Sequence, residues 1–140
     1  MLHLMKLCVG VRDPAHLKRL QQARLQGDPP LRHRTRHIPR RRQELLAGGS
    51  IYWVICGALR VRQRLVDIVE VRTTSGGPGC ALILDPRLVP VEAHLVKPFQ
   101  GWRYLEPAAA PADLAKSRTA IGAKRLPEPL REALAMLCLL

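Results

Sequence analysis

Acidic residues are scarce in this chain of 140 residues, which contains 11 aspartates and glutamates against 23 lysines and arginines. The net charge of +12 at neutral pH leaves many cations without an acidic counterpart, so the composition favours a polyanionic partner. Nucleic acid, anionic lipid and an acidic protein all fit that description. The length suits one hydrophobic core, and we therefore expect a single domain over residues 1–140.

Long hydrophobic runs are lacking too. No apolar stretch reaches the ~20 residues that a membrane-spanning helix needs, which argues against a membrane span. The apolar opening of the chain is interrupted by Lys6 and is not followed by a small-residue cleavage site, so it does not fit a signal peptide. We expect buried free thiols in a cytoplasmic protein, because no C-x-x-C pair occurs among Cys8, Cys56, Cys80 and Cys138.

Recognisable catalytic motifs are absent. The chain contains no G-x-S-x-G, Walker or G-x-G-x-x-G sequence. His33 and His37 are the only closely spaced pair of histidines, and zinc needs further ligands, so we predict neither a metal nor a cofactor. Cys8 or Cys56 would act as a nucleophile only beside a histidine base, which the sequence does not reveal. No catalytic residue is therefore predicted, and an enzyme stays an open alternative.

Arginine is abundant, and residues 32–64 carry nine arginines around one apolar strand. A guanidinium group binds phosphate through two parallel hydrogen bonds, whereas lysine offers only a point charge. A GC-rich genome, which encodes cations as arginine, is the alternative explanation for the scattered arginines. We predict phosphate contacts from Arg34, Arg36, Arg40, Arg41 and Arg42, with a track continued by Arg60, Arg62 and Arg64.

Capping residues and hydrophobic spacing predict three helices. Asp13 and Pro14 are typical of a helix start, and Gly27 ends that helix. Pro39 starts a second helix, whose first turn holds three consecutive arginines. Cations at this positive end of a helix dipole are unfavourable and indicate an anion site. Residues 106–126 are expected to form a loose connector before a terminal helix over residues 127–140.

Apolar runs and alternating patterns predict the strands. Residues 50–56 are apolar on both faces, as in a central strand that is covered on both sides. Residues 59–71 alternate between apolar and charged side chains, so one face of this strand meets the core. Residues 74–79 are rich in glycine and form a hairpin loop. Further strands are expected within residues 2–11, 33–38, 80–84 and 89–96.

Gln63 and Asp67 interrupt the alternation, because both stand at apolar positions. A buried amide or carboxylate costs free energy unless it is hydrogen-bonded. One interpretation is a core network, or a bulge near Leu65 and Val66 that turns Asp67 outward. The other is a polar pocket formed by Gln63, Asp67 and Cys56.

Aromatic residues are few, and three of the five lie within residues 97–105. Trp102 and Tyr104 flank Arg103, and aromatic rings beside arginine can stack on unpaired bases. We therefore add Trp102, Arg103 and Tyr104 to the candidate nucleic-acid-binding residues. The alternative is that Trp102 and Tyr104 close one end of the sheet.

Five sequence blocks carry a family resemblance: MLHLMKLCVGV, RTRHIPRRRQELLAGGSIYWVICG, LRVRQRLVDIVEV, LILDPRLV and KPFQGWRYL. Together they resemble a family of short alphaproteobacterial proteins, the uncharacterised domain of unknown function 1489. This resemblance implies no activity. In this family a cation often occupies the position of Cys56.

A second resemblance is architectural. A helix that ends in Gly-Gly, an apolar strand with Tyr and Trp, and a long basic strand are similar to the opening of PUA-like barrels, including the ASCH and EVE groups. That resemblance implies binding of RNA or a modified base. We predict an α+β fold with a small mixed or barrel-like sheet and flanking helices. Nucleic acid, and RNA in particular, is the leading partner; the alternatives are a small enzyme for a phosphorylated or carboxylated metabolite and a protein-interaction module, and no oligomeric state is predicted.

Overall fold

A computed structural model describes residues 1–115, and the predicted terminal helix over residues 127–140 lies outside them. The described residues form, in order, β1 (His3–Leu7), α1 (Pro14–Gly27), β2 (Arg32–Thr35), α2 (Arg42–Leu46), β3 (Ser50–Ile55), β4 (Ala58–Arg72), β5 (Pro78–Leu95), β6 (Trp102–Leu105) and a 3-10 turn (Pro107–Ala109). The predicted α+β class is confirmed.

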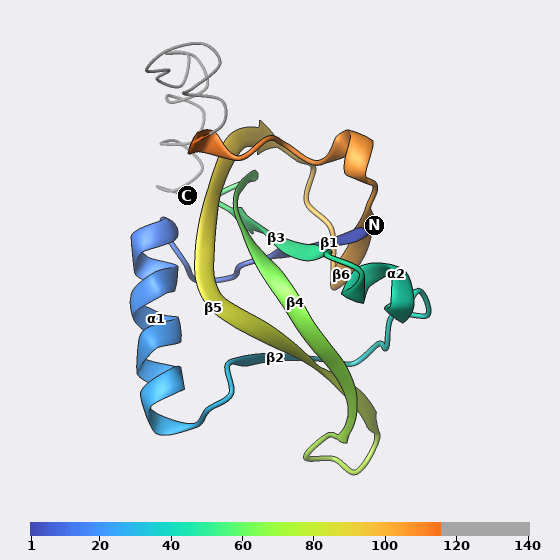
Figure 1. Cartoon of the computed structure of the whole chain (residues 1–140). Helices are drawn as coiled ribbons and strands as arrows, with labels where there is room; N and C mark the ends of the chain where they lie inside the picture. Colours follow the sequence, from blue (N-terminus) through green and yellow to red (C-terminus); the bar gives the residue numbers. More distant parts are fainter. Residues whose placement is uncertain (116–140) are drawn as a thin grey trace.

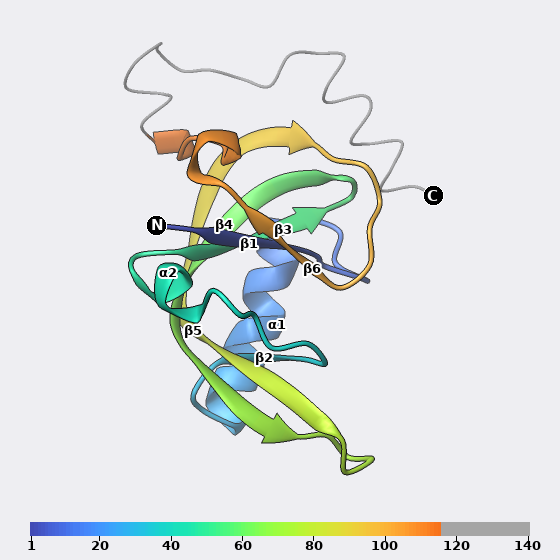
Figure 2. The ribbon, with the colours of Figure 1, turned by 90° about the vertical axis from the view of Figure 1, so that its right-hand side faces the viewer.

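The six strands form one mixed sheet in the order β2-β5-β4-β3-β1-β6. β1 pairs with β3 in parallel, and the other neighbouring strands in residues 1–115 pair antiparallel. The long β4–β5 hairpin crosses the molecule, with α1 and α2 on opposite sides of it (Figure 1). Its tip projects away from the remaining elements (Figure 2). The prediction of a small mixed sheet is therefore confirmed.

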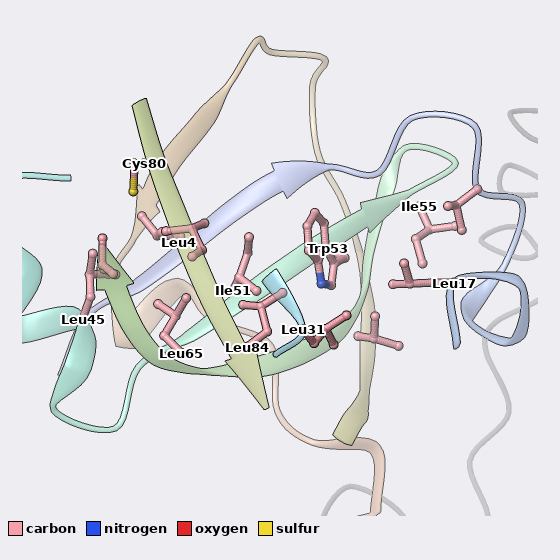
Figure 3. Packing of buried hydrophobic residues seen from close by; sticks show 14 of the residues in the cluster. Leu4, Leu17, Leu31, Leu45, Ile51, Trp53, Ile55, Leu65, Cys80 and Leu84 are labelled. Carbon is pink, nitrogen blue, oxygen red and sulfur yellow. The ribbon is translucent and has the colours of Figure 1, made fainter. Parts of the chain in front are cut away.

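β3 lies at the centre of the fold, and all of its residues are buried. Ile51, Trp53 and Ile55 point into the larger core cluster, which also receives Leu17 from α1 and Leu31 from the segment just before β2 (Figure 3). The other face of β3 contributes Tyr52 and Val54 to a second cluster. Both faces are covered, as the continuous apolar run predicts.

Helix α1 begins and ends where its capping residues predict. The Asp13 carboxylate accepts a hydrogen bond from the His16 backbone N–H at 2.7 Å, and Pro14 occupies the first turn. Leu17 and Gln21 are the buried residues of this helix. Because one of the two is an amide, the inner face of α1 is partly polar where it meets the sheet.

Two features of the long hairpin concern the sequence predictions. β5 runs unbroken from Pro78 to Leu95, so the prediction of two separate strands here is wrong. β2 pairs with residues 80–83, and Val91 bridges Asp113, so within residues 1–115 the middle of β5, residues 85–90, lacks a neighbour on that side. Prolines are tolerated at such an edge. The register shifts between Leu65 and Asp67, which confirms the predicted bulge.

Candidate functional site

Five predicted phosphate ligands lie within one stretch of residues 34–42, which we call the arginine segment. It includes the end of β2, the following loop and the first residue of α2. The side chains of Arg34, Arg36 and Arg40 are exposed and form no ion pair with any residue of the described part of the chain. These three cations are therefore available to an external anion.

The last two arginines of the segment are instead paired with carboxylates. Arg41 donates from Nη2 to Glu44 Oε1 at 2.8 Å, and this interaction lowers the pKa of Glu44. Arg42 donates to Asp67 Oδ1 and, from Nε, to the Ile68 carbonyl at 2.9 Å. Helix α2 covers only Arg42–Leu46, so it starts later than the predicted Pro39.

The arginines of β4 occupy three different environments. Arg62 binds Asp113 through Nε at 2.7 Å and Nη2 at 2.8 Å, so its charge is compensated within the chain. Arg60 is partly buried, and desolvation lowers its pKa. Arg64 is exposed. The sheet therefore does not extend the arginine segment as one uniform track of free cations.

The two aromatic residues of β6 hold the arginine segment against the sheet. Trp102 Nε1 donates to the His37 carbonyl at 2.9 Å. The Tyr104 hydroxyl oxygen accepts hydrogen bonds from the backbone N–H groups of Arg40 at 3.0 Å and Arg41 at 3.2 Å. The loop that follows one edge strand, β2, is thus bonded to the other edge strand, β6. Its three exposed arginines stand on an anchored backbone.

Arg103 lies between these two aromatic residues in sequence, but its side chain contacts a third aromatic ring, that of Phe99. Its guanidinium carbon is 5.2 Å from the ring centroid of Phe99. Trp102 and Tyr104 instead contact each other edge to face, with ring centroids 5.0 Å apart. The three residues therefore do not form one flat stacking surface.

The structure does not bring Gln63, Asp67 and Cys56 together. Gln63 is fully buried and Asp67 pairs with Arg42 at the surface. Cys56 is disulfide-bonded, so the prediction of a free thiol is wrong for this residue. Cys8 and Cys80 are free thiols, as predicted. The hydrogen bonds of Gln63 form a core network instead.

This core network joins α1 to three strands. Gln63 Oε1 accepts hydrogen bonds from Trp53 Nε1 and Gln21 Nε2, both at 3.0 Å. Gln63 Nε2 donates to Gln21 Oε1 at 2.7 Å and to the Asp85 carbonyl at 2.8 Å. Each polar atom of the Gln63 side chain is satisfied, as the core-network interpretation requires.

A cavity of about 230 Å³ lies between α1, the end of β1 and the start of β2, and Gln21 and Trp53 line its inner wall. Its polar lining otherwise consists of Lys6, Cys8, Arg24, Arg32 and His33. Among the described residues, no carboxylate lines the cavity. Lys6 and Arg24 form no ion pair within residues 1–115, whereas Arg32 binds Asp28 at 2.6 Å. The cavity is therefore cationic.

Burial determines the protonation of two groups in this cavity. Desolvation, with further contributions from Lys6 and Arg24, lowers the pKa of His33 to about 4. Its Nε2 atom is buried without a hydrogen-bond partner in the described structure, and its ring meets the Trp53 ring edge to face at 5.2 Å. Desolvation also raises the pKa of the Cys8 thiol to about 11. Neutral Cys8 is a poor nucleophile, which disfavours thiol catalysis at this position.

The sequence predictions missed this cavity, although two of its residues stood out. Lys6 interrupts the apolar opening of the chain, and Arg24 follows Leu17 and Leu20 at helical spacing on the apolar face of the predicted first helix. Both are cations at positions that the pattern assigns to the core. Cations at apolar positions of the pattern could have indicated a polar cavity, but Lys6 and Arg24 come together only because α1 folds back over the sheet.

Residues 1–115 offer neither a metal site nor a membrane-spanning helix. They contain no group of three or more histidine, cysteine or carboxylate side chains that is suited to a metal ion. None of their helices has the length and apolar character that a membrane crossing demands.

Comparison with known proteins identifies a family. The family model described as "Protein of unknown function (DUF1489)" matches residues 4–140, which is nearly the whole chain. No curated protein and no solved structure matches the chain.

Proposed function

We propose that this chain, which belongs to the DUF1489 family of proteins of unknown function, binds RNA through its arginine segment. The side chains of Arg34, Arg36 and Arg40 make the phosphate contacts. Arg64, also exposed, lies on β4 and adds a further cation. Arg41, Arg42 and Arg62 serve mainly structural ion pairs, so they contribute less to binding than their number suggests.

The observation that carries this proposal is the contrast between paired and unpaired cations along the arginine segment. Carboxylates neutralise Arg41 and Arg42, yet Arg34, Arg36 and Arg40 are exposed and form no ion pair with the described residues. Unpaired like charges at close spacing repel one another, and a bound polyanion relieves that repulsion. Arginine also matches the bidentate geometry of phosphate.

The anchoring of the segment supports the same function. Trp102 and Tyr104 bond to the backbone of residues 37–41, which fixes the loop before a ligand arrives. A pre-ordered loop loses less conformational entropy on binding. Trp102 and Tyr104 thus act through the position of the loop. In this proposal they are positioning residues for the phosphate contacts of Arg34, Arg36 and Arg40.

RNA is preferred over an acidic protein because the three exposed arginines share one anchored segment, whose apolar residues, Ile38 and Pro39, are not exposed. Exposed cations without exposed apolar neighbours suit an array of phosphates. The test is a binding titration of the purified chain with single-stranded RNA, duplex RNA and duplex DNA across a salt series. We expect affinity for RNA that falls steeply as salt rises. RNA binding that is absent at low salt, or is unaffected by salt, contradicts the proposal.

A further inference from the structure

We propose that the cavity between α1, β1 and β2 binds a small organic anion that consists of a phosphate or carboxylate group on an apolar body. The anionic group would contact Lys6 and Arg24, and the apolar body would contact the aliphatic walls of the cavity. This site differs from the arginine segment, and the inference does not depend on RNA binding.

The cations of the cavity determine the charge of the ligand. Lys6 and Arg24 come from different elements, β1 and α1, and both line the same space. Neither is paired with a carboxylate in the described residues. Two cations beside a partly enclosed space strengthen each other's attraction for an anion, because the low-dielectric walls weaken screening. An anionic group is therefore the ligand feature that the site favours.

The remaining walls determine the rest of the ligand. Aliphatic side chains from α1 and from the segment before β2 form much of the lining, including Leu17, Leu20 and Leu31. A volume of about 230 Å³ is too small for an extended polymer and holds one small molecule. An inorganic ion alone would leave these apolar walls without contact, so an apolar body on the anion fits better.

His33 adds a polar contact inside the same cavity. Its Nε2 is buried and has no hydrogen-bond partner in the described residues, and a buried polar atom without a partner costs free energy. A polar group on the ligand would satisfy this atom. The charged or titratable groups that line the cavity with it are Lys6, Cys8, Arg24 and Arg32. An anion bound among them favours the imidazolium form, so binding raises the pKa of His33 from about 4.

The probes are phenyl phosphate and benzoate, with benzamide as the uncharged analogue. Calorimetry on the full chain measures affinity, and NMR of the His33 ring across pH measures its pKa with and without probe. We expect at least one anion to bind, benzamide to bind at least about tenfold more weakly, and the His33 pKa to rise. If phenyl phosphate binds more tightly than benzoate, the site prefers a phosphate to a carboxylate as the anionic group of its ligand.

Variants connect binding to the two cations. Lys6→Gln with Arg24→Gln should weaken anion binding at least about tenfold, whereas Lys6→Arg should retain it. Lys18→Gln with Arg19→Gln removes the same charge from exposed positions of α1 and should leave binding unchanged. The proposal is overturned if neither anion binds, if benzamide binds as tightly, or if the first variant binds normally. Amide NMR spectra of each variant verify that it is folded.

Discussion

Gln21 and Gln63 exchange two hydrogen bonds between α1 and β4: Gln21 Nε2 donates to Gln63 Oε1 at 3.0 Å, and Gln63 Nε2 donates to Gln21 Oε1 at 2.7 Å. Trp53 Nε1 donates to the same Gln63 oxygen at 3.0 Å. Both amides are buried, so their polar atoms depend on each other rather than on water. The pair also fixes the helix that forms one wall of the cationic cavity.

Gln63→Leu should destabilise the fold strongly. The change leaves the Gln21 amide and Trp53 Nε1 buried without their partner, at a cost of about 1 to 3 kcal/mol for each unsatisfied group. Urea unfolding measures the loss. Gln22→Leu, at an exposed position of α1, is the control and should change stability by less than about 0.5 kcal/mol. Similar losses in both variants would contradict a satisfied network at Gln63.

The Arg62–Asp113 ion pair should stabilise the fold more than an exposed pair does. Its side chains are 27% and 19% exposed, against 43% and 50% for Arg41 and Glu44. Double-mutant cycles with Arg62→Met and Asp113→Asn should give a coupling of about 1 to 3 kcal/mol, and the solvent-screened Arg41–Glu44 pair should give a smaller one. Equal couplings would show that partial burial does not strengthen the Arg62–Asp113 pair.

Acid should destabilise the protein through His33. Its pKa is about 4 in the fold, against 6.5 as its ordinary value. Below pH 6.5 the unfolded chain takes up a proton that the folded chain resists until about pH 4, so stability is full above this window and falls within it. The free energy of unfolding falls by about 3 kcal/mol across this window, and the His33 contribution levels off at lower pH.

Unfolding titrations at several pH values measure this effect. His33→Phe removes the titrating group and should flatten the dependence between pH 6.5 and 4. The free energy of unfolding of this variant should still fall somewhat with decreasing pH, because burial and the nearby Arg62 charge also lower the pKa of His3. His94→Gln, at an exposed position, should leave the slope unchanged. A slope that is identical in His33→Phe and the parent would refute the burial of a neutral His33.

Tyr104→Phe should loosen the arginine segment without changing its charge. The hydroxyl oxygen that accepts from the Arg40 and Arg41 backbone N–H groups is lost, which costs about 1 kcal/mol. Hydrogen exchange at these two amides should become faster, while exchange in β3 should change little. Unchanged exchange at Arg40 and Arg41 would show that Tyr104 does not hold the loop.

Local features of the fold could be predicted from sequence. Asp13, Pro14 and Gly27 act within a few residues of the helix that they delimit, so spacing alone identifies α1. Alternation likewise places the buried face of β4, and a polar residue at a buried position indicates the bulge near Asp67. β5 is harder to predict, because proline usually ends a strand. Pro86 and Pro90 lie in the stretch of β5 that has no neighbour on one side within residues 1–115, and prolines are tolerated there.

The candidate sites depend on distant residues and could be predicted only in part. The arginine segment was visible as a cluster, but the carboxylates that neutralise Arg42 and Arg62 lie 25 and 51 residues away. Which cations stay free is thus a property of the tertiary structure. The cavity around His33 forms only where α1, β1 and β2 meet, which sequence spacing does not show. The architectural likeness to PUA-like barrels stays a prediction.

The most direct test of RNA binding by the arginine segment compares two variants with equal charge. One carries Arg34→Gln, Arg36→Gln and Arg40→Gln; the other carries Lys18→Gln, Arg19→Gln and Arg87→Gln, which are exposed cations elsewhere. The measurement is the slope of log affinity for single-stranded RNA against log salt concentration. Loss of three phosphate contacts should reduce the steepness of that slope by about 2 in the first variant, with little change in the second. Equal reductions in both variants would mean that net charge, and not the arginine segment, binds the RNA.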